Sequence, residues 1–272
     1  MTPEELLTRL RTKYESQYHV PLTPRDLLAL REMETEQLIC ANCQGDGLCE
    51  LKPNGYQHVA EVEYGRLYIV QKECDYFARR EMSLKCARAG IPRRYADKNY
   101  DDYEWDDRNA ESLDVAQWYT KLYPARWLYI HGGCGVGKTA LASLIGRELL
   151  KQGKDVLFRE NQELLNELKA SFDNEQVSTS AVLEKYQTCE VLILDDIGLG
   201  LLSDWGVGIL EQVINERYNR DLRTIITANY DLEDLEERLG SGDKYAARRI
   251  VSRIGGQSEI LDMGQGDKRW EN

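Results

Sequence analysis

Residues 130–139 read Ile-His-Gly-Gly-Cys-Gly-Val-Gly-Lys-Thr and match the phosphate-binding P-loop pattern G-x-x-x-x-G-K-[ST]. The motif has the context it requires, because residues 127–130 are typical of a buried strand and residues 140–150 of a helix. Backbone N–H groups can point inward at phosphate oxygens only in conformations that glycine reaches at little cost. We therefore predict that a nucleotide binds at Gly132, Gly133, Cys134, Gly135, Val136, Gly137, Lys138, Thr139 and Ala140.

The last residues of this motif carry its chemistry. The ammonium group of Lys138 is expected to neutralise the β- and γ-phosphates, and the hydroxyl of Thr139 to ligate Mg²⁺. The helix that follows turns its positive end towards the phosphates. ATP and Mg²⁺ are therefore the predicted ligands of this loop.

A second motif, Glu190-Val-Leu-Ile-Leu-Asp-Asp196, is a continuous apolar run that ends in two carboxylates. Such a run is typical of a central strand of a parallel sheet. It follows the P-loop by about 60 residues, the interval at which a nucleotide-binding domain places a neighbouring strand. We expect Asp195 to hold Mg²⁺ through water and Asp196 to polarise the attacking water.

Asn229, and one arginine of the pair Arg249 and Arg253, are further candidates for contact with the nucleotide. Asn229 is the last residue of a predicted strand over residues 223–229, where its amide can position water beside the γ-phosphate. Arg217 lies near the end of a predicted helix over residues 205–220, as does Arg220. Arg253 shares a helix face with Arg249 four residues earlier, a pattern equally typical of a solvated basic face.

The first part of the chain differs in character. Two capping patterns, Thr2-Pro-Glu-Glu5 and Thr23-Pro-Arg-Asp26, predict a pair of helices, and the alternation around Gly65 predicts a β-hairpin. Cys40-Ala-Asn-Cys43 and Cys49 can ligate one ion from a tight turn, and the hairpin would return a fourth thiolate to them. The predicted Zn²⁺ ligands are Cys40, Cys43, Cys49 and Cys74, with His58 and Cys86 as substitutes; a redox pair and unliganded buried cysteines are the alternatives.

Composition sets the remaining limits. The chain has 272 residues, a net charge of −12 and seven cysteines. It shows no signal-peptide pattern and no apolar run of membrane-spanning length, so we expect a cytoplasmic protein with reduced thiols and no membrane partner. The negative charge confines any nucleic-acid contact to a local basic patch. We predict three parts: residues 1–90, a connector over 91–111, and a nucleotide-binding domain over 112–272.

Taken together, these motifs resemble the AAA+ ATPase of bacterial helicase loaders, the DnaC/DnaI family. The resemblance covers about residues 90–265 and rests on five segments in order: Gly132–Thr139, Asp195–Gly198, Ile214–Tyr218, Thr227–Asn229 and Arg249–Arg253. It implies an α/β fold, a three-layer AAA+ core with a parallel sheet, preceded by a small, mostly helical zinc-binding domain that binds the helicase. It also implies that Asn229 is sensor 1, Arg217 an arginine finger that reaches a neighbouring subunit, with Arg220 as its rival, and Arg253 sensor 2.

The function implied is an ATP-dependent loader that binds the replicative hexameric helicase, delivers it onto single-stranded DNA and self-associates through its ATP sites. Asp196 stands where many AAA+ ATPases have glutamate, so hydrolysis is expected to be slow. Two alternatives stay open: a transposition helper ATPase of the IstB type, and a nucleotide-regulated adaptor with negligible hydrolysis.

Overall fold

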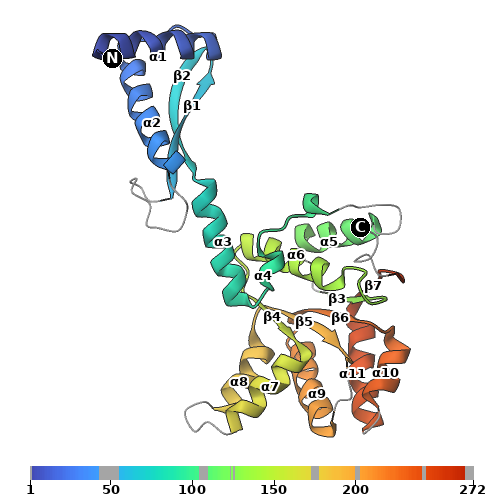
Figure 1. Ribbon diagram of the computed structural model, residues 1–272. Coiled ribbons are helices and arrows are strands. Elements are labelled where there is room, and N and C mark those ends of the chain that lie inside the picture. The colour runs from blue at the N-terminus through green and yellow to red at the C-terminus, as the bar shows by residue number, and fades with distance from the viewer. Residues whose placement is uncertain are drawn as a thin grey trace. The chain divides into compact units, whose positions relative to one another are not determined.

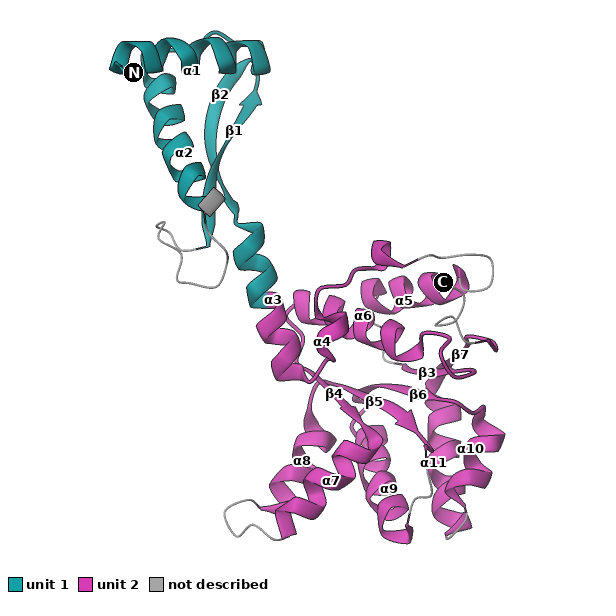
Figure 2. Ribbon diagram, in the orientation of Figure 1, with its two compact units in different colours: residues 1–81 teal, residues 82–272 magenta. Residues whose placement is uncertain are grey.

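The computed structural model describes residues 2–42, 55–103, 110–122, 124, 126–172, 178–199, 203–240 and 243–266. The chain divides into two compact units, residues 1–81 and 82–272 (Figure 2). This division falls inside helix α3 (Asp75–Ala89). It therefore precedes the predicted domain boundary at residue 90, and residues 91–103 belong to the second unit.

The first unit contains helices α1 (Pro3–Tyr18) and α2 (Pro24–Asn42) and an antiparallel hairpin of β1 (Tyr56–Glu63) and β2 (Arg66–Glu73). Thr2 and Glu5 form the predicted capping box at the start of α1. The hairpin turns through Tyr64 and Gly65, which both have positive φ. Buried residues of the helices, among them Leu10 and Leu30, form a core that hairpin residues also contact. The predicted helix pair and hairpin are thus confirmed.

Of the predicted zinc ligands, Cys43 and Cys49 lie outside the described residues. Cys40 lies near the end of α2, and Cys74 follows β2 directly, with its N–H donating to the Gly55 carbonyl at 2.8 Å. Within the described ranges, no group of three or more His, Cys, Asp or Glu side chains is arranged to hold a metal ion. The four-cysteine site therefore stays a prediction.

Neither substitute ligand is suited to that role in this structure. The two ring nitrogens of His58 already contact Glu36 Oε2 at 2.6 Å and Gln71 Nε2 at 3.2 Å. Cys86 is fully buried in the second unit, and burial raises the pKa of its thiol. Because zinc binds the thiolate, this environment opposes ligation by Cys86.

The second unit is built on a five-stranded parallel sheet in the order β4-β5-β6-β3-β7. In a parallel sheet the carboxyl ends of all strands meet at one edge, so the segments that follow β3, β5 and β6 are brought together there. The strands are β3 (Trp127–His131), β4 (Val156–Glu160), β5 (Val191–Ile197), β6 (Arg223–Ala228) and β7 (Ser258–Asp262).

Helices cover both faces of this sheet, as Figure 1 shows. Alternate residues of β3 serve the two faces: Leu128 and Ile130 join the core beneath α6, whereas Trp127 and Tyr129 join the core beneath α9 and α11. The predicted three-layer α/β core is confirmed. None of the helices in the described ranges is long and apolar enough to cross a membrane. The covering helices are α5 (Ala110–Leu122) and α6 (Lys138–Lys151) on one face, and α7 (Asn161–Phe172), α8 (Thr179–Thr188), α9 (Asp204–Asn219), α10 (Leu232–Leu239) and α11 (Lys244–Gln257) on the other.

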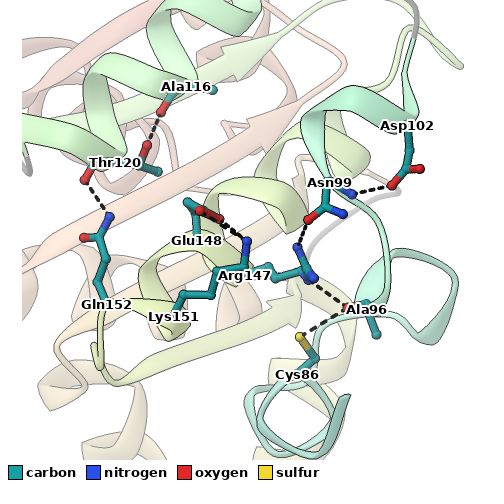
Figure 3. A network of polar contacts seen from close by, with 10 residues as sticks. All are labelled: Cys86, Ala96, Asn99, Asp102, Ala116, Thr120, Arg147, Glu148, Lys151 and Gln152. Atoms are coloured by element: carbon teal, nitrogen blue, oxygen red, sulfur yellow. Dashed lines mark hydrogen bonds and ion pairs between the residues drawn. The ribbon is translucent and has the colours of Figure 1, made fainter. Parts of the chain in front are cut away.

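The first part of the predicted connector packs on α6, the helix that follows the P-loop. It contains α4 (Arg93–Ala96) and a 3₁₀ turn, η1 (Tyr100–Asp102). Arg147 of α6 is only 9 % exposed; its Nε donates to the Ala96 carbonyl at 2.9 Å and its Nη1 to Asn99 Oδ1 at 2.6 Å (Figure 3). Ile91 is buried in the same core, close to Gly146. The described part of this segment therefore belongs structurally to the second unit.

Candidate functional site

The loop between β3 and α6 has the backbone that a P-loop requires. Gly132, Gly135 and Gly137 adopt φ values of +142°, +77° and +105°, where a side chain would be strained. Gly137 caps the start of α6 in the left-handed conformation. Gly133 is not among the positive-φ glycines, so three of the four predicted glycines need their conformational freedom.

Lys138 lies at the start of α6 and is almost fully buried at 5 % exposure. Its Nζ donates to the carbonyls of Gly132 at 3.0 Å and Gly133 at 2.8 Å. The loop therefore holds the ammonium group beside its own backbone. A phosphate oxygen carries full negative charge and forms a stronger hydrogen bond than these carbonyls, so Lys138 can exchange them for a bound phosphate.

Asp195 lies at the predicted position on β5 and is 1 % exposed. The Thr139 hydroxyl lies 3.0 Å from its Oδ2, and the Thr227 hydroxyl donates to its Oδ1 at 2.6 Å. Burial raises the pKa of Asp195 to about 6; the hydrogen bond from Thr227 lowers it, and the charge of Asp196 raises it further. This carboxylate is therefore destabilised until a cation binds beside it.

Asp196 occupies an irregular position in the sheet. The register of β5 against β6 shifts between Leu194 and Ile197, and Asp196 has a φ of +53°. Its N–H donates to the Thr227 hydroxyl at 2.9 Å. In a regular strand, successive side chains point to opposite faces, and this irregularity frees the two aspartates from that constraint. Thr227 thus links both residues, a role that sequence reasoning missed although Thr227 precedes Asn229 by two residues.

Asn229 follows the last residue of β6 at the same edge of the sheet. Ala228 pairs with His131, the last residue before the P-loop, and with Ile197, the residue after Asp196. The fold therefore places Asn229 between the P-loop and the two aspartates, as the sensor 1 prediction requires.

The donors at this edge suit a magnesium nucleotide. Thr139 and Asp195 supply hydroxyl and carboxylate oxygens within 3.1 Å of each other, and Mg²⁺ prefers oxygen ligands. Lys138 adds the positive charge that phosphates need. When bound, Mg²⁺ would supply Lewis-acid stabilisation of the phosphate charge. These residues therefore fit Mg²⁺ and ATP together.

The structure does not support Arg217 as an arginine finger. Its side chain is 0 % exposed. It donates to Thr224 Oγ1 at 2.9 Å and to the carbonyls of Tyr186, Cys189 and Arg223 at 3.0, 2.9 and 2.5 Å. A guanidinium group enclosed by its own chain cannot reach a neighbouring subunit. The prediction was wrong because the inner face of α9 extends to Arg217, which joins α8, α9 and β6.

Arg253 is also misplaced for its predicted role as sensor 2 on the nucleotide of its own chain. Helix α11 ends directly before β7, and Ser258 of β7 pairs with Trp127, the first residue of β3. The P-loop follows the other end of β3, about 13 Å farther along the strand. The Arg253 guanidinium instead lies 5.7 Å from the ring centroid of Tyr218 and donates to the Arg249 carbonyl at 3.0 Å.

Arg220, the rival candidate for the finger, has a different environment. It follows α9 at the same edge of the sheet as Arg253. Its side chain is 54 % exposed and its Nε contacts Glu216 Oε1 at 2.5 Å. Exposed ion pairs of this kind are weak, so the guanidinium group is accessible to a partner.

The comparisons with known proteins agree with this geometry. A family model described as IstB-like ATP binding protein matches residues 57–272. The chain belongs to this family. It is an ATP-binding protein, and the P-loop edge of its sheet is the corresponding site.

Relatives of this IstB-like chain include replicative helicase loaders. It is 26 % identical to the replicative helicase loader DnaC of Buchnera aphidicola subsp. Baizongia pistaciae over 181 residues, which cover 64 % of this chain and 70 % of the relative. A crystal structure of the DnaC helicase loader matches at 29 % identity and a TM-score of 0.55, and one of DnaI at 29 % and 0.56. Each covers 63 % of this chain, and 99 % and 94 % of the respective structure. The AAA+ core predicted from the motifs is thereby confirmed.

A cluster of Lys169, Phe172 and Trp205 lies on the IstB-like domain away from the P-loop, and sequence reasoning did not single it out. Phe172 ends α7 and is 58 % exposed. Its ring packs edge-on against Trp205 of α9, with centroids 5.9 Å apart. The Lys169 ammonium lies 5.4 Å from the Trp205 ring centroid. This aromatic–basic cluster combines the exposed ring of Phe172 and the half-buried ring of Trp205 with a positive charge.

Proposed function

We propose that this chain is an ATP-dependent loader that binds the replicative hexameric DNA helicase and delivers it onto single-stranded DNA. The observation that carries the proposal is the assembled set of Lys138, Thr139 and Asp195 in a chain that is similar to proteins named replicative helicase loaders. A cytoplasmic location is part of the proposal.

In the proposed ATPase reaction, each residue at the sheet edge has one task. Lys138 balances the phosphate charge, and Thr139 and Asp195 hold the magnesium ion. Asn229 positions the attacking water, and Asp196 polarises it. Aspartate has a shorter side chain than glutamate, and Asp196 is additionally fixed by a left-handed backbone conformation. We therefore propose slow turnover, which suits a switch better than a motor.

The proposed helicase-binding part is residues 1–90, with zinc held by Cys40, Cys43, Cys49 and Cys74. The helix pair and hairpin give this part a core of its own, which supports a separate binding role. Metal analysis of protein never exposed to chelator tests the zinc site. One equivalent of zinc is expected, and less than about half an equivalent would contradict it.

The proposed contact with single-stranded DNA is the aromatic–basic cluster. Accessible aromatic rings stack on unpaired bases regardless of sequence, and a nearby cation attracts the backbone. This local site also fits a chain whose net charge is −12.

We further propose that the chain self-associates through its ATP sites, with an arginine from one copy acting on the nucleotide of another. Arg220 and Arg253 both lie at the edge opposite to the P-loop, so neither can serve its own nucleotide. Arg220 supports this role best because its side chain is the more accessible.

A helicase transfer assay tests the central proposal. The full chain and its cognate helicase are mixed with ATP and a fluorescent forked DNA. The single-stranded tail of the fork is coated with a single-stranded-DNA-binding protein, so that the helicase needs a loader to reach it. Unwinding of the fork is recorded. Lys138→Ala should abolish the ATP-dependent stimulation. Lys151→Ala removes a lysine at the other end of α6 that pairs with Glu148, and it should retain full stimulation. Equal stimulation by Lys138→Ala and the natural chain would refute an ATP-dependent loader.

A second assay tests the DNA contact and separates the loader from a transposition helper. Binding of labelled oligo-dT is measured by anisotropy for Phe172→Ala and for Tyr245→Ala, which removes a ring that is 76 % exposed on α11. Phe172→Ala should weaken binding about tenfold and Tyr245→Ala less than twofold, given the usual contribution of base stacking. The same measurement is made with labelled duplex DNA, because a transposition helper of the IstB type is expected to bind duplex DNA. Tighter binding of the duplex than of oligo-dT would favour the transposition helper instead.

A further inference from the structure

The chain that follows β7 runs along the first half of the P-loop. The Met263 N–H donates to the His131 carbonyl at 2.8 Å, and the Gly133 N–H donates to the Gly264 carbonyl at 2.8 Å. The second contact occupies a backbone donor within the P-loop itself. We call residues 262–266, which begin with the last residue of β7, the strap.

The strap lies close to two glycines of the loop. A Cβ atom at Gly132 would come within 2.7 Å of the Gly264 carbonyl oxygen. A Cβ atom at Gly133 would come within 2.7 Å of Gln265 Oε1. Gly133 is not at positive φ and the P-loop pattern does not demand glycine there. Gln265 Oε1 ends a flexible side chain that can move aside, but Gln265 Cα would also lie 3.3 Å from the added Cβ atom, so a larger residue at position 133 would push the strap away from the loop.

The strap is held in turn by its own first residues. The Gly264 N–H donates to Asp262 Oδ1 at 2.8 Å, and Gly264 adopts a φ of +72°. The same carboxylate lies 3.9 Å from His131 Nδ1. Met263 is 9 % exposed and joins the core that also contains Val136 of the P-loop. Asp262 thus fixes the turn that brings the Gly264 carbonyl to Gly133.

We propose that the strap positions the P-loop for nucleotide binding, with Asp262 and Gly264 as positioning residues that do not touch the nucleotide. A loop whose backbone is already fixed loses less conformational entropy when a phosphate binds, so its affinity is higher. By thermodynamic linkage, nucleotide binding must stabilise the strap to the same extent. The inference rests on ATP binding at the P-loop and not on delivery of a helicase.

Two matched pairs of variants test the strap in the full chain. Asp262→Ala removes the acceptor for the Gly264 N–H, whereas Asp262→Asn keeps an acceptor and removes the charge. Gly264→Ala strains the residue that holds Gly133, whereas Gly266→Ala strains a positive-φ residue, φ +115°, for which no P-loop contact is seen; neither added methyl group meets an atom within 4 Å. Affinity for a fluorescent ATP analogue with Mg²⁺ is measured, together with the urea midpoint of the nucleotide-free protein.

Asp262→Ala and Gly264→Ala should each weaken ATP binding about 5- to 10-fold, the effect of one hydrogen bond or one strained residue. Asp262→Asn and Gly266→Ala should stay within twofold of the natural chain. Unchanged affinity in Asp262→Ala and Gly264→Ala would overturn the proposal. So would an Asp262→Asn variant as weak as Asp262→Ala, because the charge would then matter and not the hydrogen bond.

Hydrogen exchange on the natural chain gives an independent test that needs no variant. Saturating Mg-ATP should slow exchange of the amides of Met263 and Gly264 at least threefold, and unchanged exchange there would overturn the strap. The two proposals fail separately. A natural chain that binds ATP but does not stimulate the helicase in the transfer assay would refute the loader alone, whereas unchanged ATP affinity in Asp262→Ala and Gly264→Ala would refute the strap alone.

Discussion

Replacing Asp195 by asparagine should make the nucleotide-free protein more stable while abolishing ATP hydrolysis. Asp195 is 1 % exposed, and burial raises the pKa of its carboxyl from the ordinary 3.8 to about 6. A raised pKa means that the folded state holds the proton more tightly than the unfolded state. Between pH 3.8 and 6 the folded protein therefore binds more protons, and its free energy of unfolding falls as the pH rises.

The size of the effect follows from the pKa difference. A shift of about two units corresponds to about 3 kcal/mol of destabilisation once the carboxyl is ionised in both states, as it is at pH 8. Asparagine has nearly the same shape, keeps an acceptor for the Thr227 hydroxyl and carries no charge. Asp195→Asn should therefore raise the free energy of unfolding by about 3 kcal/mol at pH 8, and by about half of that at pH 5.

Urea unfolding followed by tryptophan fluorescence measures this directly, because all five tryptophans of the chain lie in residues 82–272. The protein must be free of Mg²⁺ and nucleotide. Asp196→Asn makes the same charge change at a half-buried neighbour and serves as the control. Because burial raises the pKa of Asp195 more than the Asp196 charge does, this control should stabilise the protein less than Asp195→Asn. A variant that is no more stable than the natural chain at pH 8, or a difference that does not shrink towards pH 5, would refute the reasoning.

Three further predictions concern the other polar contacts. Arg217→Ala leaves buried carbonyls without a donor and should lower the free energy of unfolding by about 3 kcal/mol, whereas Arg220→Ala should change it by less than about 1 kcal/mol in the same urea assay; equal effects would contradict the assignment. Asn229→Ala should keep ATP affinity within twofold but lower steady-state phosphate release about 10- to 100-fold, and a matching loss of affinity would argue against a role in positioning water. Arg147→Met should release the segment over residues 91–103 and speed its cleavage by trypsin about tenfold; an unchanged cleavage rate would show that apolar packing alone holds the segment.

The P-loop and the Asp195–Asp196 pair could be predicted because each depends on a short stretch of chain with strict backbone demands. Their proximity was also predictable, since the carboxyl ends of parallel strands share one edge. Asn229 reaches that edge for the same reason.

The arginines show where sequence reasoning failed. Arg217 follows Leu210, Val213 and Ile214 at helical spacing, so the periodicity already placed it on the inner face of α9. Arg217 was nevertheless predicted to be an arginine finger, because the family resemblance was given more weight than this periodicity. The prediction that Arg253 is sensor 2 failed for a topological reason. Helix α11 leads into the parallel strand β7, so it ends at the edge of the sheet opposite to the carboxyl ends of the strands.

Other contacts join segments that are distant along the chain and therefore left little local signal. Lys169 and Phe172 are three residues apart on one helix, but Trp205 comes from another helix, so the cluster emerged only in the fold. The contact between Gln265 and Gly133 likewise joins two segments that are distant along the chain. The only sign of this contact in the sequence is Gly133, a glycine that the P-loop pattern does not require.

The segment anchored by Arg147 bears on how such chains are divided and recombined. A fragment that starts at residue 112 would lack Ala96 and Asn99, so the nearly buried guanidinium group of Arg147 would lose both acceptors. It would also expose the apolar surface that Ile91 covers. Such a fragment should aggregate, whereas one that starts near Met82 should remain intact. An exchange of amino-terminal parts between related ATPases, in evolution or by engineering, would then succeed at a junction within α3 and fail at one only thirty residues later, even though the later junction lies closer to the first strand of the sheet.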